Sequence, residues 1–286
     1  MVVISIDGAL VAPEQATISV LDRGLLYGDG CFEVLRTWGG APRELDAHLD
    51  RLYETAAVLE LAALPRPQLA EAVRAAVRAA AAGGGEHRIR IMLTRGPGSL
   101  AARPAELGPG RAIVIVEPLP PQPAELSLAA VDWPLPARRG RGHKTLAYLD
   151  AVIAHELARA AGADEAIRLV AGDGGGGGGD GGLVAEGATC NLFAVRGGEV
   201  ATPPVDRGAL PGIVRARVLA ICARDGIPAR ERPLPLRELR EADEVFATSS
   251  LRGVVPVTRL DGAPLARGPV TTQIADAYAA AMRAPP

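Results

Sequence analysis

Alternating and periodic apolar positions divide the first 117 residues into short strands and two amphipathic helices. We expect strands over residues 2–6 and 16–20, with turn residues Asp7 and Gly8 between them. Asp46 is expected to cap a helix, and an alanine-rich helix should cover residues 67–82. The inward stripe of the first helix should be Leu49, Leu52, Tyr53, Ala56 and Leu59, and further strands should cover residues 31–38, 88–94 and 111–117.

A proline-rich segment over residues 118–125 predicts a stiff linker, which separates a small N-terminal domain (residues 1–117) from a larger C-terminal domain (residues 126–286). After a basic loop over residues 138–143, Thr145 can cap a helix that buries Leu146, Leu149, Val152, Ile153 and Leu157. Pro211 should begin a helix that runs to residue 224. Strands are expected over residues 126–133, 166–170, 192–195 and 244–248, and the glycine-rich residues 172–182 are expected to form a flexible hairpin turn.

Composition and charge exclude several classes of protein. The chain has 286 residues, 48% of them hydrophobic, and a formal net charge of −2 without a run of like charge, so we expect no nucleic-acid partner. No apolar stretch has membrane-spanning length, and no basic segment precedes the first apolar run. The three separated cysteines form neither a disulfide framework nor a zinc site. We therefore expect a cytoplasmic protein without a metal site.

Lys144 is the only lysine among the 31 lysines and arginines of the chain. A guanidinium stays protonated and cannot form an imine, whereas the ε-amine of lysine can lose its proton when buried and attack a carbonyl. The sequence therefore raises the hypothesis that Lys144 is a reactive amine. Chance in an arginine-rich chain is the alternative.

A lysine that holds an aldehyde cofactor such as pyridoxal 5′-phosphate needs three kinds of partner, and the chain offers each. Glu186 could keep the pyridine nitrogen protonated. The amides at the start of the helix after Pro211, the hydroxyls of residues 248–250 and the guanidinium of Arg51 could bind the phosphate. Each feature alone is typical of an ordinary turn, helix start or solvated arginine, but their joint presence favours a cofactor site.

The same residues resemble the class IV aminotransferases, which are fold-type IV pyridoxal-phosphate enzymes. The resemblance extends along nearly the whole chain in seven blocks, and the most specific ones contain Lys144 and Glu186. The blocks are Asp22-Arg-Gly-Leu-Leu-Tyr-Gly-Asp-Gly-Cys-Phe-Glu33, His48-Leu-Asp-Arg-Leu52, Lys144-Thr-Leu-Ala-Tyr-Leu149, Ala185-Glu-Gly-Ala-Thr-Cys-Asn-Leu-Phe193, Thr202-Pro-Pro204, Leu210-Pro-Gly-Ile213 and Asp243-Glu-Val-Phe246 with Thr248-Ser-Ser250.

The resemblance implies a two-domain α/β (α+β) subunit with a barrel-like C-terminal domain, a cofactor at the domain junction and a homodimer as the smallest working unit. It makes Lys144 the Schiff-base lysine and Glu186 the partner of the pyridine nitrogen. The implied phosphate ligands are Arg51, Ile213, Val214, Ser249 and Ser250; Leu210 would pack on the ring, Tyr148 would approach the ring hydroxyl, and Tyr27, Phe32 and Arg90 would line the substrate side.

Some positions depart from the family pattern. Ala147 stands where relatives often have asparagine, and Val214 replaces a frequent threonine, so one hydroxyl contact to the phosphate should be missing. Val34 after Phe32-Glu33 lacks the glycine common in branched-chain enzymes.

The family leaves three reactions open. A branched-chain aminotransferase and a D-amino-acid transaminase both move an amino group between an amino acid and a 2-oxo acid, whereas aminodeoxychorismate lyase releases pyruvate and 4-aminobenzoate. Arg88 and Arg90 share one face of a strand, where either could pair with a substrate carboxylate or with an acid of the protein. We expect amino transfer, with the lyase as the alternative. A non-catalytic cofactor-binding protein would not need Glu186.

Overall fold

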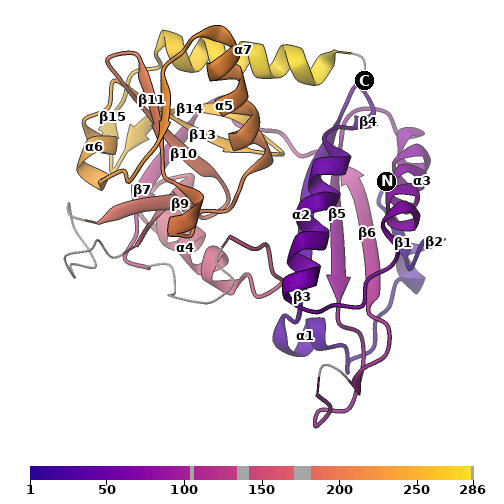
Figure 1. Ribbon diagram of the computed structural model, residues 1–286. Coiled ribbons are helices and arrows are strands. Elements are labelled where there is room, and N and C mark those ends of the chain that lie inside the picture. The colour runs from indigo at the N-terminus through magenta and orange to yellow at the C-terminus, as the bar shows by residue number, and fades with distance from the viewer. Residues whose placement is uncertain (104–105, 134–141, 171–181, 285–286) are drawn as a thin grey trace. The chain divides into compact units, whose positions relative to one another are not determined.

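The computed structural model describes residues 1–103, 106–133, 142–170 and 182–284 (Figure 1). The chain divides into two compact units. Unit 1 comprises Met1–Pro121 together with His143–Tyr148, and unit 2 comprises Gln122–Gly142 and Leu149–Pro286. Residues 143–148, which the sequence analysis placed in the C-terminal domain, therefore pack with unit 1. Residues 172–181 of the glycine-rich insert and residues 138–141 of the basic loop lie outside the described residues.

Unit 1 is built on a six-stranded sheet in the order β2-β1-β6-β5-β3-β4. Each pairing between neighbours is antiparallel. The strands are β1 (Val3–Ile6), β2 (Ala9–Val11), β3 (Gly30–Trp38), β4 (Ala41–Pro42), β5 (His87–Thr94) and β6 (Arg111–Pro118).

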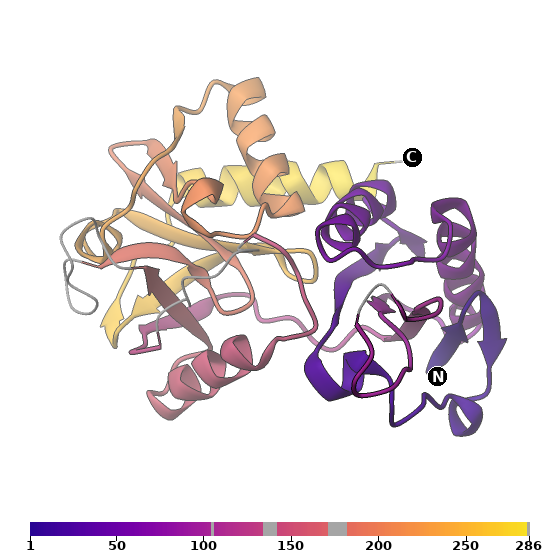
Figure 2. The same ribbon diagram turned by 60° about the horizontal axis from the view of Figure 1, so that its bottom comes forward.

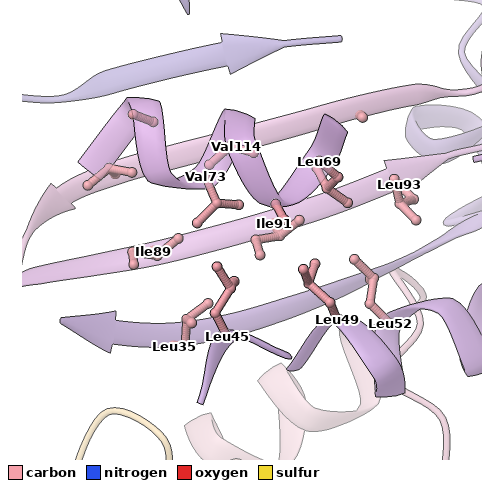
Figure 3. Packing of buried hydrophobic residues seen from close by; sticks show 14 of the residues in the cluster. Leu35, Leu45, Leu49, Leu52, Leu69, Val73, Ile89, Ile91, Leu93 and Val114 are labelled. Carbon is pink, nitrogen blue, oxygen red and sulfur yellow. The ribbon is translucent and has the colours of Figure 1, made fainter. Parts of the chain in front are cut away.

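Helices α2 (Leu45–Val58) and α3 (Arg66–Ala81) cover one face of this sheet, and the short helix α1 (Arg23–Tyr27) precedes β3 (Figure 1). Alternate residues of β3 and β5 point toward the two helices. Figure 3 shows the resulting core, in which side chains from both helices meet those of β3, β5 and β6. The core includes Leu35, Leu45, Leu49, Leu52, Leu69, Val73, Ile89, Ile91, Leu93 and Val114.

Unit 2 contains a curled, mixed sheet in the order β12-β11-β10-β13-β14-β7-β8-β9, with β15 paired to β14. Its parallel pairings join β7 to β8, β14 to β7 and β11 to β12. The strands are β7 (Leu126–Ala130), β8 (Glu165–Val170), β9 (Leu183–Gly187), β10 (Asn191–Arg196), β11 (Glu199–Thr202), β12 (Ala229–Glu231), β13 (Glu244–Ser249), β14 (Gly253–Leu260) and β15 (Ala263–Pro264).

The helices of unit 2 pack on both faces of the curled sheet. Helices α5 (Ile213–Asp225) and α7 (Pro269–Arg283) lie side by side, as Figure 2 shows, and cover β13. Phe193 and Phe246 stack across β10 and β13 with ring centroids 4.6 Å apart. The opposite face packs against α6 (Leu236–Arg240), and α4 (Leu149–Ala160) packs on β7 and β8. This mixed α/β architecture confirms the expected fold class.

Three local expectations were wrong. Residues 16–20 form no strand, because Asp7 and Gly8 both have positive φ and form a tight two-residue turn, after which β2 begins at Ala9. Glu44, not Asp46, occupies the N-cap position of α2. Helix α5 begins at Ile213 with Gly212 as its N-cap, so Pro211 precedes it.

The expected inward stripe of α4 was also wrong. The helix begins at Leu149, beyond Thr145, and it buries Ala151, Ala154 and Ala158. Leu149 is 68% exposed and Leu157 is 41% exposed. The small alanines let the helix approach the sheet closely, so the larger side chains point outward. None of the described helices is long and apolar enough to cross a membrane.

Candidate functional site

Lys144 lies in an extended segment that pairs with the open edge of β3. The backbone N–H of Phe32 donates to the carbonyl oxygen of Lys144 at 2.9 Å, and the N–H of Leu146 donates to the carbonyl oxygen of Gly30 at 2.9 Å. Cys31 and Thr145 form an isolated antiparallel bridge between these two bonds. Two backbone hydrogen bonds therefore fix the lysine beside β3, which is why its segment belongs to unit 1.

The side chain of Lys144 lies among aromatic rings. Its Nζ atom is 4.6 Å from the ring centroid of Phe32 and 5.3 Å from that of Tyr148. The two rings meet edge to face at 5.1 Å, and the guanidinium carbon of Arg90 lies 4.2 Å from the Phe32 centroid. Unit 1 thus gathers an amine, a guanidinium and a second aromatic ring around one buried phenylalanine, Phe32.

The two arginines of β5 differ in their partners. Arg88 and Arg90 point away from Ile89 and Ile91, which lie in the core, so the expectation that the arginines share one face is confirmed. Arg88 forms an ion pair with Glu117 of the neighbouring strand β6. Arg90 instead stays beside Phe32, and burial lowers the pKa of its guanidinium. A protein acid therefore engages Arg88, whereas Arg90 contacts the same Phe32 ring as Lys144.

Tyr27 occupies the end of α1, where it is 53% exposed. The guanidinium carbon of Arg23 lies 4.7 Å from its ring centroid. The observed ring contacts therefore link Phe32, Tyr148 and Arg90 to the lysine but do not include Tyr27.

Arg51 is held by a buried cluster that the sequence analysis missed. Its Nε and Nη2 atoms donate to the two carboxylate oxygens of Glu33, each at 2.7 Å, and Nδ1 of His48 lies 2.7 Å from Glu33. Glu33 is 0% exposed. Because Glu33 lies on β3 between the inward-facing Cys31 and Leu35, the period-2 pattern marked it as an acid on an apolar face.

Within this cluster, Glu33 is ionised and His48 is neutral. Burial alone would raise the pKa of Glu33, but the hydrogen bonds and charges of His48 and Arg51 hold it at about 2. Burial lowers the pKa of His48 in spite of Glu33, so the imidazole is neutral at pH 7 and donates its Nδ1–H to the carboxylate. The bidentate pair with an ionised Glu33 therefore fixes the orientation of the Arg51 guanidinium.

Replacing Glu33 with glutamine should lower the free energy of unfolding by about 3–5 kcal/mol, because the guanidinium of Arg51 loses the buried carboxylate that neutralises it. The carboxyl has a reference pKa of 4.5 and a folded-state pKa of about 2. Its stabilising contribution is thus present above the reference value and is lost as the pH falls toward 2. Urea unfolding should show the two proteins converging across this pH range, and a constant difference would contradict the prediction.

In unit 2, Glu186 and a second residue, Asn191, hold the backbone N–H and C=O of one residue, Leu210, between them. The N–H of Leu210 donates to a carboxylate oxygen of Glu186 at 2.9 Å, and Nδ2 of Asn191 donates to the carbonyl oxygen of Leu210 at 2.9 Å. Glu186 lies on β9, and Asn191 begins β10. A Cβ on Gly212 would lie 1.9 Å from Oδ1 of Asn191, so the close approach requires glycine. The start of α5 is therefore tied to β9 and β10.

The same end of the sheet carries the expected phosphate ligands. Gly212 caps α5 without a side-chain hydrogen bond, and Ile213 and Val214 are the first helical residues. Asn191 pairs with Thr248, after which Ser249 ends β13 and Ser250 begins the following turn. Asn191 is thus a neighbour both of the residues that lead into α5 and of the end of β13 that leads to Ser249 and Ser250.

These residues fit a phosphate group. Helix N-termini offer amides and a positive dipole end to an anion, and hydroxyls add donors. The Oγ1 atom of Thr248 is buried without a hydrogen-bond partner among the described residues. A buried hydroxyl without a hydrogen-bond partner in the protein is typical of a site where a bound anion accepts its hydrogen bond. No group of three or more metal-ligating side chains is found in the described part of the chain.

Comparison with known proteins gives the family. Residues 30–260 match the family model described as amino-transferase class IV. A protein of Methanocaldococcus jannaschii with the provisional name branched-chain-amino-acid aminotransferase is 35% identical over 266 residues, which is 91% of this chain and 88% of the relative. A D-alanine aminotransferase of Bacillus licheniformis is 30% identical over 281 residues, which cover 94% of this chain and 93% of the relative.

Solved structures are similar over nearly the whole length. The branched-chain aminotransferase of Thermoproteus uzoniensis with norvaline has a TM-score of 0.87 and 32% identity, covering 98% of this chain and 94% of that chain. A T.th. branched-chain amino acid aminotransferase complexed with N-(5'-phosphopyridoxyl)-L-glutamate also has a TM-score of 0.87, with 30% identity and the same coverage.

Proposed function

Since the chain belongs to the class IV aminotransferases, we propose that Lys144 is the residue that binds pyridoxal 5′-phosphate and moves the proton at the substrate Cα. When bound, this cofactor supplies an aldehyde for condensation with amines and a ring that accepts electrons from Cα. The observation that carries the proposal is the amine of Lys144, the only lysine, which lies against the Phe32 and Tyr148 rings, while Arg90 contacts the same Phe32 ring.

We propose that Glu186 holds a proton at the pyridine nitrogen. Its carboxylate is oriented by the N–H of Leu210, whose side chain would pack on the ring. The phosphate ligands would be Arg51, Ile213, Val214, Ser249 and Ser250. Support for them comes from the clamped guanidinium of Arg51, the uncapped N-terminus of α5 and the unsatisfied Thr248 hydroxyl.

We propose that the substrates are an amino acid of branched-chain or D-amino-acid type and a 2-oxo acid. Relatives of both names are similar to this chain over most of its length, at 35% identity for the branched-chain name and 30% for the D-alanine name. Arg90 would bind a substrate carboxylate, and Phe32 and Tyr27 would contact the side chain. Arg88 is a weaker candidate because it already pairs with Glu117.

A panel of substrates tests the proposal. Incubation of the purified protein with L- and D-amino acids plus 2-oxoglutarate or pyruvate should give the corresponding new amino acid. Chiral chromatography of the product then identifies the hand of the substrate. A parallel incubation with aminodeoxychorismate should give no product. Release of pyruvate and 4-aminobenzoate in that incubation, without transfer in the others, would assign the chain to the lyases of the family.

We further propose a homodimer. The outward-facing Leu149, Val152 and Leu157 of α4 are each at least 41% exposed in the single chain, and an interface would remove this apolar surface from water. Sedimentation equilibrium should therefore report twice the chain mass of 29.5 kDa, and a mass of one chain at micromolar concentration would contradict the proposal. The cytoplasmic location stays a prediction.

A further inference from the structure

Glu165, at the start of β8, is a fully buried carboxylate that the proposed chemistry does not use. It accepts hydrogen bonds from the backbone N–H of Ala188 at 3.1 Å, from the hydroxyl of Thr189 and from Nη1 of Arg252 at 3.2 Å. The Nδ1 atom of His155 on α4 lies 3.7 Å from it. Burial would raise the pKa of Glu165, but these partners together lower it, so the group is ionised at neutral pH.

Apart from the N–H of its neighbour Ala166, the hydrogen-bond donors to Glu165 come from two turns that adjoin Glu186 and Ser249, which are proposed cofactor ligands of unit 2. Ala188 and Thr189 lie between Glu186 and Asn191, in the turn from β9 to β10. Arg252 lies in the turn from β13 to β14, which follows Ser249 and contains Ser250, and its backbone N–H donates to the Ser249 hydroxyl at 3.4 Å. One carboxylate therefore joins both turns.

A buried charge with several partners is weak evidence for a role in stability. Desolvation of an ionised carboxylate is costly, and apolar side chains of similar volume often replace buried ionic groups without loss of stability. What the charge does provide is a fixed geometry, because several donors from separate segments must converge on two oxygen atoms.

We propose that Glu165 is a positioning residue that fixes the ring-nitrogen partner and the phosphate hydroxyls relative to each other. Through its hydrogen bond with Thr189, Glu165 would fix the position of Glu186. Through its hydrogen bond with Arg252, it would fix the positions of Ser249 and Ser250. The inference rests on the proposed binding of pyridoxal phosphate and assigns a role to residues that touch no part of the cofactor themselves.

A matched control exists in the same unit. Glu244 is also buried, and its carboxylate accepts the N–H groups of Val270 and Thr271 at the start of α7, at 3.1 and 2.7 Å. It begins β13, whereas Ser249 ends that strand, so the two lie about 17 Å apart along it. The substitutions Glu165→Gln and Glu244→Gln are chemically identical, but only the first removes the carboxylate that accepts hydrogen bonds from the two turns.

The experiment measures the dissociation constant of pyridoxal 5′-phosphate from the apo-protein, by the absorption spectrum of the bound cofactor, together with the melting temperature of each apo-protein. Glu165→Gln should weaken binding by about 10–100-fold, whereas Glu244→Gln should lower the melting temperature and leave the dissociation constant within about 3-fold of wild type. Equal weakening by both variants would overturn the proposal, because loss of stability would then explain both.

A second pair of variants covers the case in which Glu165→Gln does not fold. Thr189 is exposed, so Thr189→Val and Thr189→Ser should both fold. Only the serine variant keeps the hydroxyl that donates to Glu165, and it should retain wild-type affinity while the valine variant binds more weakly. Wild-type affinity in Thr189→Val and in any folded Glu165→Gln would overturn the inference. Failure of the wild-type protein itself to bind the cofactor would instead refute the proposed function.

Discussion

Replacing Lys144 with alanine should lower the rate of amino transfer by about 10³-fold or more, because the reaction loses both its nucleophilic amine and the group that moves the Cα proton. Lys144→Arg is the matched control for charge. It keeps a cation next to Phe32 but has no primary amine to condense with an aldehyde. Both variants should therefore be inactive to a similar degree.

Covalent labelling measures the same role directly. Borohydride treatment of the wild-type protein with pyridoxal phosphate should add the reduced cofactor to the peptide that contains Lys144. Since the sequence has no other lysine side chain, the labelled peptide identifies the site. Equal labelling of the alanine variant, or full activity in the arginine variant, would contradict the assignment.

Replacing Glu186 with glutamine should leave most of the cofactor bound but lower turnover by about 100-fold or more, because a neutral amide does not keep the pyridine nitrogen protonated. The amide oxygen can still accept the hydrogen bond from the N–H of Leu210, so the start of α5 should keep its position. Cofactor content, measured after denaturation, separates a loss of chemistry from a loss of binding. Turnover equal to that of the wild type would refute the role.

Long periodic segments were predicted well because local pattern and tertiary packing agree there. The strands expected over residues 31–38, 88–94 and 111–117 correspond to β3, β5 and β6, and the alanine-rich helix corresponds to α3. In α4, the local pattern and the tertiary packing disagreed. The pattern selected its leucines and valine as the buried stripe, but the neighbouring alanines of β7 and β8 leave room only for a close helix, so alanines face inward.

The candidate site was only partly predictable for a related reason. Lys144 was identified by its uniqueness in the sequence, but its pairing with Gly30 and Phe32 joins segments more than 100 residues apart, which local patterns cannot reveal. Glu186 resembled a turn residue and lies on a strand instead. The roles of Glu33 and Glu165 depend on donors from distant elements, although an acid on an apolar strand face was a usable signal for Glu33.

The distribution of nucleophiles in this chain also affects how the protein can be attached to a surface or a dye. All three cysteines are buried, and burial raises the pKa of each thiol, that of Cys31 to about 12. Thiol reagents therefore have no readily ionised target among these three cysteines, and Lys144 is the only lysine side chain that an amine reagent can modify. Amine coupling at Lys144 should inactivate the enzyme if the proposed role of this lysine holds, whereas a single cysteine added at a surface loop would give a defined conjugate in which Lys144 stays unmodified.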